Sequence, residues 1–513
     1  MTPRGTSGAD LNPTPRVPDR RPPRSTGPAT LLVGTAGTVR QLLPALGALE
    51  VKPALVGCLL PKPAILPLAV LGGFDQLASL AARPDVEQVL VSLPAAMGET
   101  LSKLAKVLDE IDVAWRYLPP LTDQLAGLVR ASEVGDVAER RGAVRGAGVD
   151  VARLINRRPR PLDDAAIASR VAGQTVLITG AGGSIGSELS AVVARYRPGR
   201  LVLVERAENA LFQIDREMGR RFPGLPRRAV LHDVTQRERT ADLLAELRPD
   251  VIFHAAAHKH VPMMEDHPAE AVENNFYGTR SIADAADACG CGGFVMISSD
   301  KAVNPSSVMG ATKRLAELYI RGLDAKSRTT FCMVRFGNVL GSACSLIPIW
   351  TEQLAQGGPL TVTHPEMTRY FMTIPEAAGL VLQAGAYARG GEVFLLDMGE
   401  PIRIMDMADR FLRMQGFTPG QDVAIDLTGP RPGEKLFEEL AYHGEDMQPT
   451  PHPSIRLWQT GAADAGQLEQ ITAMFDRLRD RSGDGRRLWR DATPESVVLA
   501  LRALLPEMVT AAA

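Results

Sequence analysis

Two short runs that lie close together in the chain carry side chains suited to acid–base chemistry. The first is Ser-Ser-Asp-Lys at 298–301, and the second is Met-Gly-Ala-Thr-Lys at 309–313. Asp300 and Lys301 are adjacent, so a carboxylate and an amine can handle protons at one place. The methionine and lysine of the second run are four residues apart, which puts them on one face of a helix. Because methionine cannot exchange a proton, we expect the acid–base groups to come from the first run.

The second run is similar to the active site of short-chain dehydrogenase/reductases, with one change. That family uses Tyr-x-x-x-Lys, and here Met309 stands in the tyrosine position and Lys313 in the lysine position. None of the seven tyrosines has a lysine four residues later. The similarity implies that Ser299 holds the reacting oxygen of the substrate and that Lys313 hydrogen-bonds the nicotinamide ribose.

A glycine-rich turn upstream has the spacing of a dinucleotide site. Gly-x-x-Gly-x-x-Gly follows the apolar run 175–179 and opens a helical pattern. Glycine permits a tight turn and a close approach of pyrophosphate to the helix N-terminus. Since the strand–turn–helix context is present, the motif predicts a nicotinamide cofactor. The predicted contacts in this turn are Gly180, Gly183, Ser184, Ile185 and Gly186.

The end of the next predicted strand favours NAD over NADP. Glu205 stands there, where a carboxylate binds the ribose hydroxyls and repels an extra phosphate. Arg206 beside it acts in the opposite sense. The other predicted cofactor contacts follow the third and fourth strands and are Asp233, Val234, Ala255, Ala256 and Ala257.

The elements that must position these groups alternate between strand and helix, which is typical of a parallel sheet. We therefore predict an α/β fold with two Rossmann-like, doubly wound sheets. The second is an extended short-chain dehydrogenase/reductase domain that carries a C-terminal substrate subdomain. Its six predicted strands are 175–179, 200–204, 228–232, 251–254, 293–297 and 329–335.

The same patterns predict the division of the chain. The first domain has the turn Gly34-Thr-Ala-Gly37-Thr-Val-Arg40, and an arginine in the third glycine position would crowd a pyrophosphate. We therefore expect this domain to bind no nucleotide. The predicted parts are a disordered tail over 1–28, the small Rossmann-like domain over 29–130, a connector over 131–172, the cofactor domain over 173–345, the substrate subdomain over 346–445 and a helical region over 446–513.

Composition excludes several classes of protein. The chain has 513 residues, 45% hydrophobic and 23% charged, and its net charge of −2 gives no indication of a nucleic-acid partner. The most apolar stretch, 54–73, is broken by prolines, so we predict no membrane span. Five scattered cysteines indicate buried thiols in a reducing cytoplasm. The His-x-x-x-His-x-His run at 254–260 lies at a strand end on the cofactor side, and we expect no metal there.

Taken in order, the motifs resemble CapD-type nucleotide-sugar 4,6-dehydratases and epimerases of polysaccharide biosynthesis. Members of this family often begin with four transmembrane helices, which this sequence lacks, and they tend to have Arg-Gly after Ser342, where this chain has Ala343-Cys344. The resemblance covers about 173–445. The matching stretches are 179–188, 254–261, 300–305, 308–314, 335–342, 367–372 and 431–435.

The resemblance implies a reaction. With Met309 in the tyrosine position, the motif is similar to that of one branch of the family. Enzymes of this branch dehydrate UDP-N-acetylglucosamine with tightly bound NAD and retain the C5 configuration. Asp300 would then be the acid for the C6 hydroxyl, and Lys301 the base at C5. A lysine base needs a depressed pKa, which we expect burial and the nearby Lys313 to supply. A water or Asp300 must take the C4 hydroxyl proton.

The resemblance also implies the residues that contact the UDP-sugar. Arg369 and Arg431 are candidates for the diphosphate, because arginine offers a fork of donors. The other predicted substrate contacts are Lys259, Asn275, Asn338 and Glu434.

Three other functions stay open. A 4-epimerase and a C5-inverting dehydratase share the fold, and Met309 argues against both. A non-catalytic NAD-binding sensor is a different class, and the joint presence of Ser299, Asp300, Lys301 and Lys313 argues against it. We expect a homo-oligomer, as is common for such folds.

Overall fold

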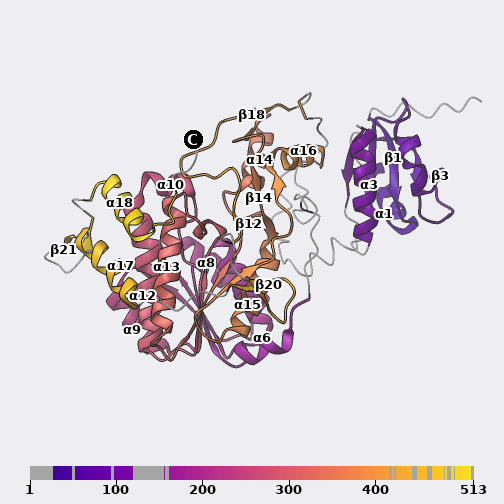
Figure 1. The fold of residues 1–513 in the computed structure, drawn as a ribbon. Helices are drawn as coiled ribbons and strands as arrows, with labels where there is room; N and C mark the ends of the chain where they lie inside the picture. The colour runs from indigo at the N-terminus through magenta and orange to yellow at the C-terminus, as the bar shows by residue number, and fades with distance from the viewer. Residues whose placement is uncertain are drawn as a thin grey trace, which may run out of the picture. The chain divides into compact units, whose positions relative to one another are not determined.

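The computed structural model describes residues 27–48, 52–93, 97–111, 113–118, 155, 161–414, 417, 419–420, 423–441, 447–458, 465–478, 480–481, 487–489 and 492–509. The chain divides into two compact units, residues 1–137 and 138–513 (Figure 1). Nearly all of the predicted tail over 1–28 lies outside the described residues. So does most of the predicted connector over 131–172.

The small unit is a parallel α/β sheet, as predicted. Its strand order is β3-β2-β1-β4-β5. Alternate residues of β1 pack on opposite faces: Leu32 joins a core with Val39 of α1, while Leu31 joins one with residues of α2 and α3. This alternation is the period-2 pattern of a strand covered on both sides. The elements are β1 (Ala29–Gly34), α1 (Ala36–Gly47), β2 (Ala54–Leu59), β3 (Val70–Gly72), α2 (Leu77–Ala81), β4 (Gln88–Ser92), α3 (Gly98–Ile111) and β5 (Ala114–Tyr117).

The large unit has a nine-stranded sheet in the order β19-β20-β16-β11-β10-β9-β6-β7-β8. The six predicted strands are confirmed, and they run parallel in doubly wound order. The seventh parallel strand, β16, and the antiparallel β20 and β19 were not predicted. The strands are β6 (Thr175–Thr179), β7 (Arg200–Glu205), β8 (Arg227–Leu231), β9 (Val251–His254), β10 (Gly293–Ile297), β11 (Thr330–Arg335), β16 (Glu392–Leu396), β19 (Met447–Pro449) and β20 (Ile455–Trp458).

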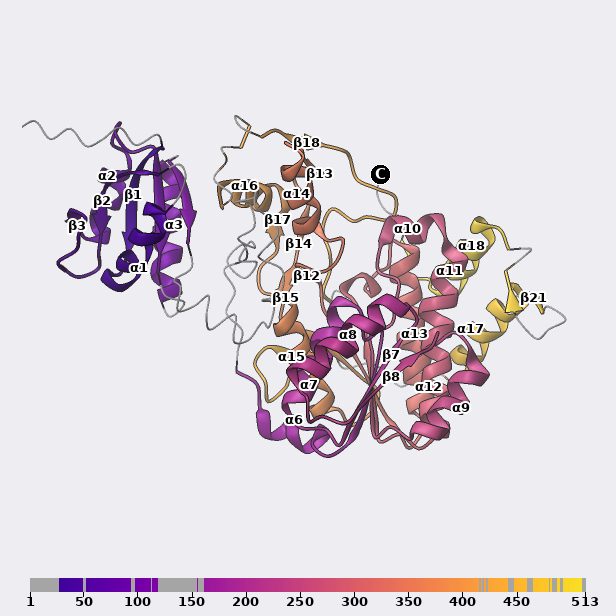
Figure 2. The same ribbon diagram turned by 180° about the vertical axis from the view of Figure 1, so that it is seen from behind.

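Helices cover both faces of this sheet (Figure 2). One face packs against α6, α7, α8 and α15, and the other against α9, α12, α13, α17 and α18. The predicted C-terminal helices are confirmed as α17 and α18. The helices are α6 (Asp164–Val171), α7 (Ser184–Arg195), α8 (Glu208–Arg221), α9 (Arg237–Leu247), α12 (Gly278–Ala288), α13 (Val308–Asp324), α15 (Ile374–Tyr387), α17 (Ala465–Leu478) and α18 (Pro494–Leu504).

The start of the cofactor domain differs from the prediction. Helix α6 lies in the predicted connector, yet Ile167 and Val171 are buried in the core with α7 and α15. Their i,i+4 spacing gives a short helix one apolar face, which needs a partner. The large unit therefore includes residues before Gly173.

A smaller layer follows β11. Helices α14 (Leu346–Ala355) and α16 (Ile404–Met414) share a core with short paired strands. These pairs are β12 (Asn338–Leu340) with β15 (Phe371–Thr373), β13 (Leu360–Val362) with β18 (Ile425–Leu427), and β14 (Thr368–Arg369) with β17 (Ile402–Arg403). Among the described residues, no helix has the length and apolar character needed to cross a membrane.

Candidate active site

The glycine turn after β6 brings backbone very close to backbone. Gly180 has φ +63°, and a Cβ there would lie 2.8 Å from the Ala256 nitrogen. A Cβ on Gly186 would lie 2.1 Å from the Gly180 oxygen. Gly183 is the N-cap of α7 and has no side chain to cap it. The turn therefore fits a pyrophosphate at the uncapped end of α7.

A pocket of about 300 Å³ continues from this turn along the strand ends. The Glu205 carboxylate lies on its wall and accepts hydrogen bonds from the backbone nitrogens of Gly182 (3.2 Å), Arg206 (2.9 Å) and Ala207 (3.0 Å). Those contacts hold the carboxylate beside the turn. The predicted cofactor residues that line the pocket are Gly180, Gly183, Glu205, Arg206, Asp233, Val234, Ala255, Ala256 and Ala257.

The Arg206 guanidinium is held on the same wall. It donates to Asn274 Oδ1 at 3.1 Å, lies 3.1 Å from His258 Nε2, and lies 4.0 Å from Asp233 Oδ2. The pocket thus presents a carboxylate and a guanidinium together. The predicted preference for NAD depends on Glu205 acting more strongly than Arg206.

Asn275 is not a pocket residue, so its predicted substrate contact is wrong. It is fully buried in a π-helix (Val272–Tyr277). Its Oδ1 accepts from the His258 nitrogen at 2.8 Å, and its Nδ2 donates to the His258 oxygen at 3.0 Å and to Thr312 Oγ1 at 3.1 Å. The amide oxygen and nitrogen both bond to protein groups, mainly in the loop after β9, and neither faces the space where a sugar would bind.

A second pocket of about 570 Å³ adjoins the first, and both include Gly183, Ala255 and Ala257. It brings together residues from all seven of the matching stretches named in the sequence analysis. The predicted residues on its wall are Ser184, Ile185, Gly186, Lys259, Ser299, Lys301, Met309, Lys313, Asn338, Arg369, Arg431 and Glu434.

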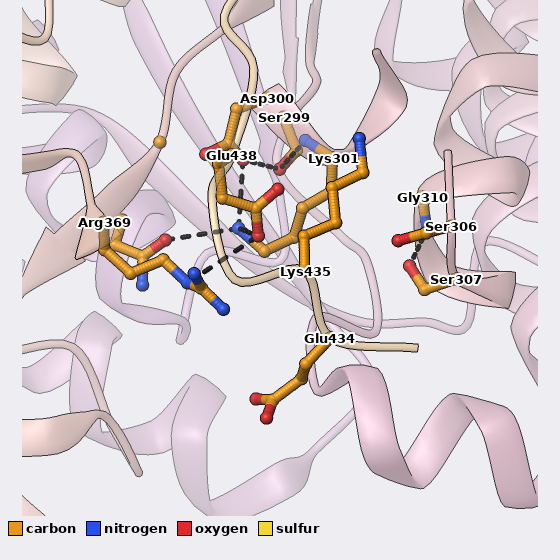
Figure 3. Close-up of polar contacts among 12 residues, drawn as sticks. Ser299, Asp300, Lys301, Ser306, Ser307, Gly310, Arg369, Glu434, Lys435 and Glu438 are labelled. Atoms are coloured by element: carbon orange, nitrogen blue, oxygen red, sulfur yellow. Dashed lines mark hydrogen bonds and ion pairs between the residues drawn. The ribbon is translucent and has the colours of Figure 1, made fainter. Parts of the chain in front are cut away.

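The acid–base residues meet at a short 3₁₀ turn, η4 (Asp300–Ala302), after β10 (Figure 3). Ser299 Oγ donates to Asp300 Oδ1 at 2.8 Å. The Lys301 ammonium donates to Asp300 Oδ1 at 3.1 Å and Asn338 Oδ1 at 3.2 Å, and it lies 3.3 Å from Glu438 Oε1. Asp300 itself is 1% exposed and lies beneath the pocket wall.

The expected depression of the Lys301 pKa is wrong. Burial acts to lower the pKa of Lys301, but the Asp300 and Glu438 carboxylates outweigh it, and the pKa is raised above its ordinary value. Lys313, which was expected to contribute, is not among the charges that shift the pKa of Lys301, and its Nζ donates to the Ile297 oxygen at 2.8 Å. Without substrate, Lys301 is therefore an ammonium ion and not a ready base.

Lys313, the other lysine of the two runs, has the depressed pKa instead. Burial lowers the pKa of Lys313 to about 8, against a smaller opposing effect of Glu317. Met309 is 3% exposed and lies one helical turn before Lys313 on α13. The pair lines the pocket side by side, as the i,i+4 spacing predicted.

The histidine run after β9 has a structural role at its first member. His254 is buried between Thr179 Oγ1 at 2.7 Å and Thr279 Oγ1 at 3.0 Å. Burial and the Lys313 charge lower the pKa of His254 to about 3, so the ring is neutral. Within the described residues, no group of three or more histidine, cysteine or acidic side chains could hold a metal ion.

Glu438 is a member of the site that sequence reasoning missed. Its carboxylate is buried, with Oε1 near Lys301 Nζ and 3.7 Å from Arg369 Nε. Arg369 is also buried, and its Nη1 donates to the Thr368 oxygen at 2.7 Å and the Leu436 oxygen at 3.2 Å. The only signal in the sequence was a glutamate three residues after the matched motif that ends at Lys435.

The outer part of the pocket carries exposed charge. Arg431 pairs with Glu434 at 2.6 Å, and its side chain is 56% exposed. Lys259 donates to the Ala343 oxygen at 2.9 Å, and burial lowers the pKa of Lys259. Cys344, expected among the buried thiols, is exposed on the pocket wall with φ +55°.

Comparison with known proteins agrees with this geometry. A family model described as "Polysaccharide biosynthesis protein" matches residues 176–460. The chain belongs to this family. The match covers the glycine turn, the acid–base turn and Glu438, and it confirms the expected relationship to CapD-type proteins.

Individual relatives show how far the similarity extends. The probable polysaccharide biosynthesis protein EpsC of Bacillus subtilis is 44% identical over 421 residues, which is 81% of this chain and 68% of EpsC. The capsular polysaccharide biosynthesis protein CapD of Staphylococcus aureus is 43% identical over 381 residues, 73% of this chain and 61% of CapD. An inverting UDP-N-acetylglucosamine 4,6-dehydratase of Campylobacter jejuni is 31% identical over 298 residues, 56% of this chain and 84% of that enzyme.

A solved structure supports the fold of the large unit. The X-ray structure of Pen from Bacillus thuringiensis matches with a TM-score of 0.53 and 32% identity. The match covers 58% of this chain and 92% of Pen.

Proposed function

We propose that the protein is an NAD-dependent 4,6-dehydratase that acts on UDP-N-acetylglucosamine and retains the C5 configuration. The observation that carries this proposal is the pairing of the pocket residue Lys301 with the buried Asp300 beneath it, in a pocket where Met309 occupies the tyrosine position. The named dehydratase among the relatives supports the substrate class. The product would be a 4-keto-6-deoxy sugar for surface polysaccharide or glycan synthesis.

The residues present fit a dinucleotide. The uncapped N-terminus of α7 would hold the pyrophosphate, and Glu205 would accept hydrogen bonds from the adenosine ribose. Lys313 would contact the nicotinamide ribose. When bound, NAD supplies redox chemistry by accepting the hydride that leaves C4 and giving it back at C6.

Proton transfer falls to side chains of the 3₁₀ turn η4. Met309 cannot take the proton of the C4 hydroxyl, so Asp300 takes it. Ser299, on the pocket wall, donates a hydrogen bond to Asp300 and would be the neighbour of the C4 hydroxyl. The protonated Asp300 then gives this proton to the C6 oxygen, which leaves as water. Lys301 removes the C5 proton, exchanges it with solvent and returns a solvent-derived proton to the same face, which retains the configuration.

The test is incubation of the purified protein with UDP-N-acetylglucosamine in deuterated water, followed by proton NMR. A 4-keto-6-deoxy product with deuterium at C5 and gluco configuration is the expected result. Asp300→Asn, which keeps the size of the side chain, should form no product while still binding NAD. Inversion at C4 without dehydration would show a 4-epimerase, and inversion at C5 an inverting dehydratase. Bound NAD without turnover would favour the sensor.

A further inference from the structure

Four buried charged groups surround the proposed C5 base. Asp300 and Glu438 each carry one negative charge, and Lys301 and Arg369 each carry one positive charge, so the formal charges cancel. Lys301 joins the two carboxylates, and Glu438 joins Lys301 to Arg369 (Figure 3). Burial of this many charges is costly unless each has a partner, and here the four groups are one another's partners.

The proton count of the proposed reaction, on which this inference rests, leaves one step without an acceptor. An ammonium has three hydrogens and no lone pair. Lys301 Nζ donates to Asp300 Oδ1 and Asn338 Oδ1 and forms an ion pair with Glu438 Oε1 at 3.3 Å. Lys301 must lose one of these protons before it can take the proton from C5. Asp300 is committed to the proton of the C4 hydroxyl, and the Asn338 amide is not basic.

We propose that Glu438 is the proton acceptor that turns Lys301 into the C5 base. The proton moves from Lys301 Nζ to Glu438 Oε1 across 3.3 Å. The freed lone pair on Nζ bonds to the C5 hydrogen, the C5–H electrons form the C5–C6 double bond, and the C6–O bond breaks. The oxygen leaves as water with the proton held by Asp300. Once C6 has received the hydride taken from C4, Lys301, whose protons have exchanged with solvent, protonates C5 and recovers a proton from Glu438.

The surroundings of Glu438 suit a carboxylate that gains and loses a proton. Within the part of the chain that the structure describes, its Oε2 is buried and has no hydrogen-bond partner. Its Oε1 lies 3.3 Å from Lys301 Nζ and 3.7 Å from Arg369 Nε, so Oε2 is the oxygen left without a partner among the described residues. Glu438 acts through Lys301 and touches no reacting atom, so it is a positioning and proton-holding residue.

The test compares Glu438→Gln with the unaltered protein and with Glu439→Gln. Glu439 is the matched control, because its carboxylate contacts Asn304 and Lys435, which are not among the four buried charged groups. Two steps are measured: reduction of the bound cofactor by its near-ultraviolet absorbance, and formation of product with C5 deuterium by NMR. We expect Glu438→Gln to slow product formation about 100-fold and cofactor reduction by less than about threefold.

The pH profile distinguishes proton transfer from mere support of the fold. In Glu438→Gln, Lys301 loses its acceptor and also a neighbouring negative charge, so solvent base can free the amine at high pH. The defect should therefore shrink as the pH rises. Glu438→Asp, which keeps a carboxylate one methylene further away, should recover part of the rate. Parallel loss of both steps at every pH, or turnover equal to that of the unaltered protein, would overturn the proposal.

A readout that needs no sugar separates this inference from the proposed function. The rate at which an amine-specific acylating reagent labels Lys301 is measured against pH by mass spectrometry of the holoenzyme. Labelling should begin at lower pH in Glu438→Gln than in the unaltered protein. If UDP-N-acetylglucosamine gives no product, the proposed function fails. An unchanged labelling curve contradicts the role of Glu438 in either case.

Discussion

Each unit has a strand–turn–helix corner with a glycine-rich turn, residues 34–40 where β1 meets α1 and residues 180–186 where β6 meets α7. The two turns have similar sequences, but the N-termini of their helices are capped differently. In the small unit, Thr35 caps α1: the Thr38 nitrogen donates to Thr35 Oγ1 at 3.2 Å, and the Thr35 nitrogen donates to Thr38 Oγ1 at 3.0 Å. In the large unit, Gly183 caps α7 without a side chain. The first helix therefore satisfies its own terminal amides, and the second leaves them for an anion.

The third glycine position separates the corners as well. Gly186 lies where a Cβ would collide with the Gly180 oxygen, so α7 packs tightly against its own turn. The corresponding Arg40 of α1 instead reaches out to the Ile65 oxygen at 3.0 Å. The end of α7 thus has the close and uncapped geometry that suits the proposed pyrophosphate, and the capped end of α1 does not.

Replacing Gly186 should break the large corner most completely. In Gly186→Ala the new Cβ would lie 2.1 Å from the Gly180 oxygen and force the backbone apart, so NAD affinity should fall more than about 100-fold. Calorimetric titration with NAD measures the loss. A control change in the turn of the small unit, Gly37→Ala, meets only Thr35 Oγ1 at 3.8 Å and should leave affinity unchanged. Equal behaviour of the two variants would contradict the distinction between the corners.

The buried lysine of the large unit should make its stability depend on pH. Because the folded-state pKa of Lys313 is about 8 and its ordinary value is 10.5, the unfolded chain binds more protons between these values. The stability cost of Lys313 is therefore complete below pH 8 and disappears as the pH rises to 10.5. Relative to Lys313→Met, the unaltered protein should gain a few kcal/mol over this range. Denaturant unfolding of both proteins as a function of pH measures the difference, and parallel curves would refute it.

A hydroxyl at the end of α7 should make the large corner resemble the small one. In Gly183→Ser the side chain can cap the amides that pyrophosphate needs, and its Cβ meets the Gly180 oxygen at 3.2 Å. NAD affinity should fall about tenfold while helix stability changes by only a few tenths of a kcal/mol. Titration together with thermal unfolding separates the two effects. A large loss of stability would instead indicate a steric cause.

Removing the cap of α1 should have the smallest effect. Thr35→Ala removes the acceptor for the Thr38 nitrogen and should cost about 1 kcal/mol of unfolding free energy in the small unit. NAD affinity should not change. Hydrogen exchange of the α1 amides localises the loss. A change in cofactor affinity would show that the small unit takes part in binding.

Sequence patterns were most successful where a local rule decides the structure. The six predicted strands of the large unit, the glycine turn and the shared face of Met309 and Lys313 all depend on spacing within one element. The strands after β11 were missed because their pairing partners lie far along the chain. Asn275 was misplaced because its partner also lies some way along the chain. An amide on the π-helix Val272–Tyr277 can face the pocket or the loop after β9, and here it faces the loop and accepts from the His258 nitrogen.

The sequence by itself determined which chemical groups follow the carboxyl ends of the predicted strands, because the end of a strand and the spacing of the residues after it are local properties of the chain. Only the tertiary structure decided how those groups are charged. Lys301 retains its proton because Glu438, from a distant segment, joins Asp300 beside it. Lys313 loses its proton at a lower pH than an ordinary lysine, because the Glu317 carboxylate offsets only part of the cost of burial. Electrostatic interaction acts through space, so the protonation of each lysine follows from its folded neighbours and not from the motif that contains it.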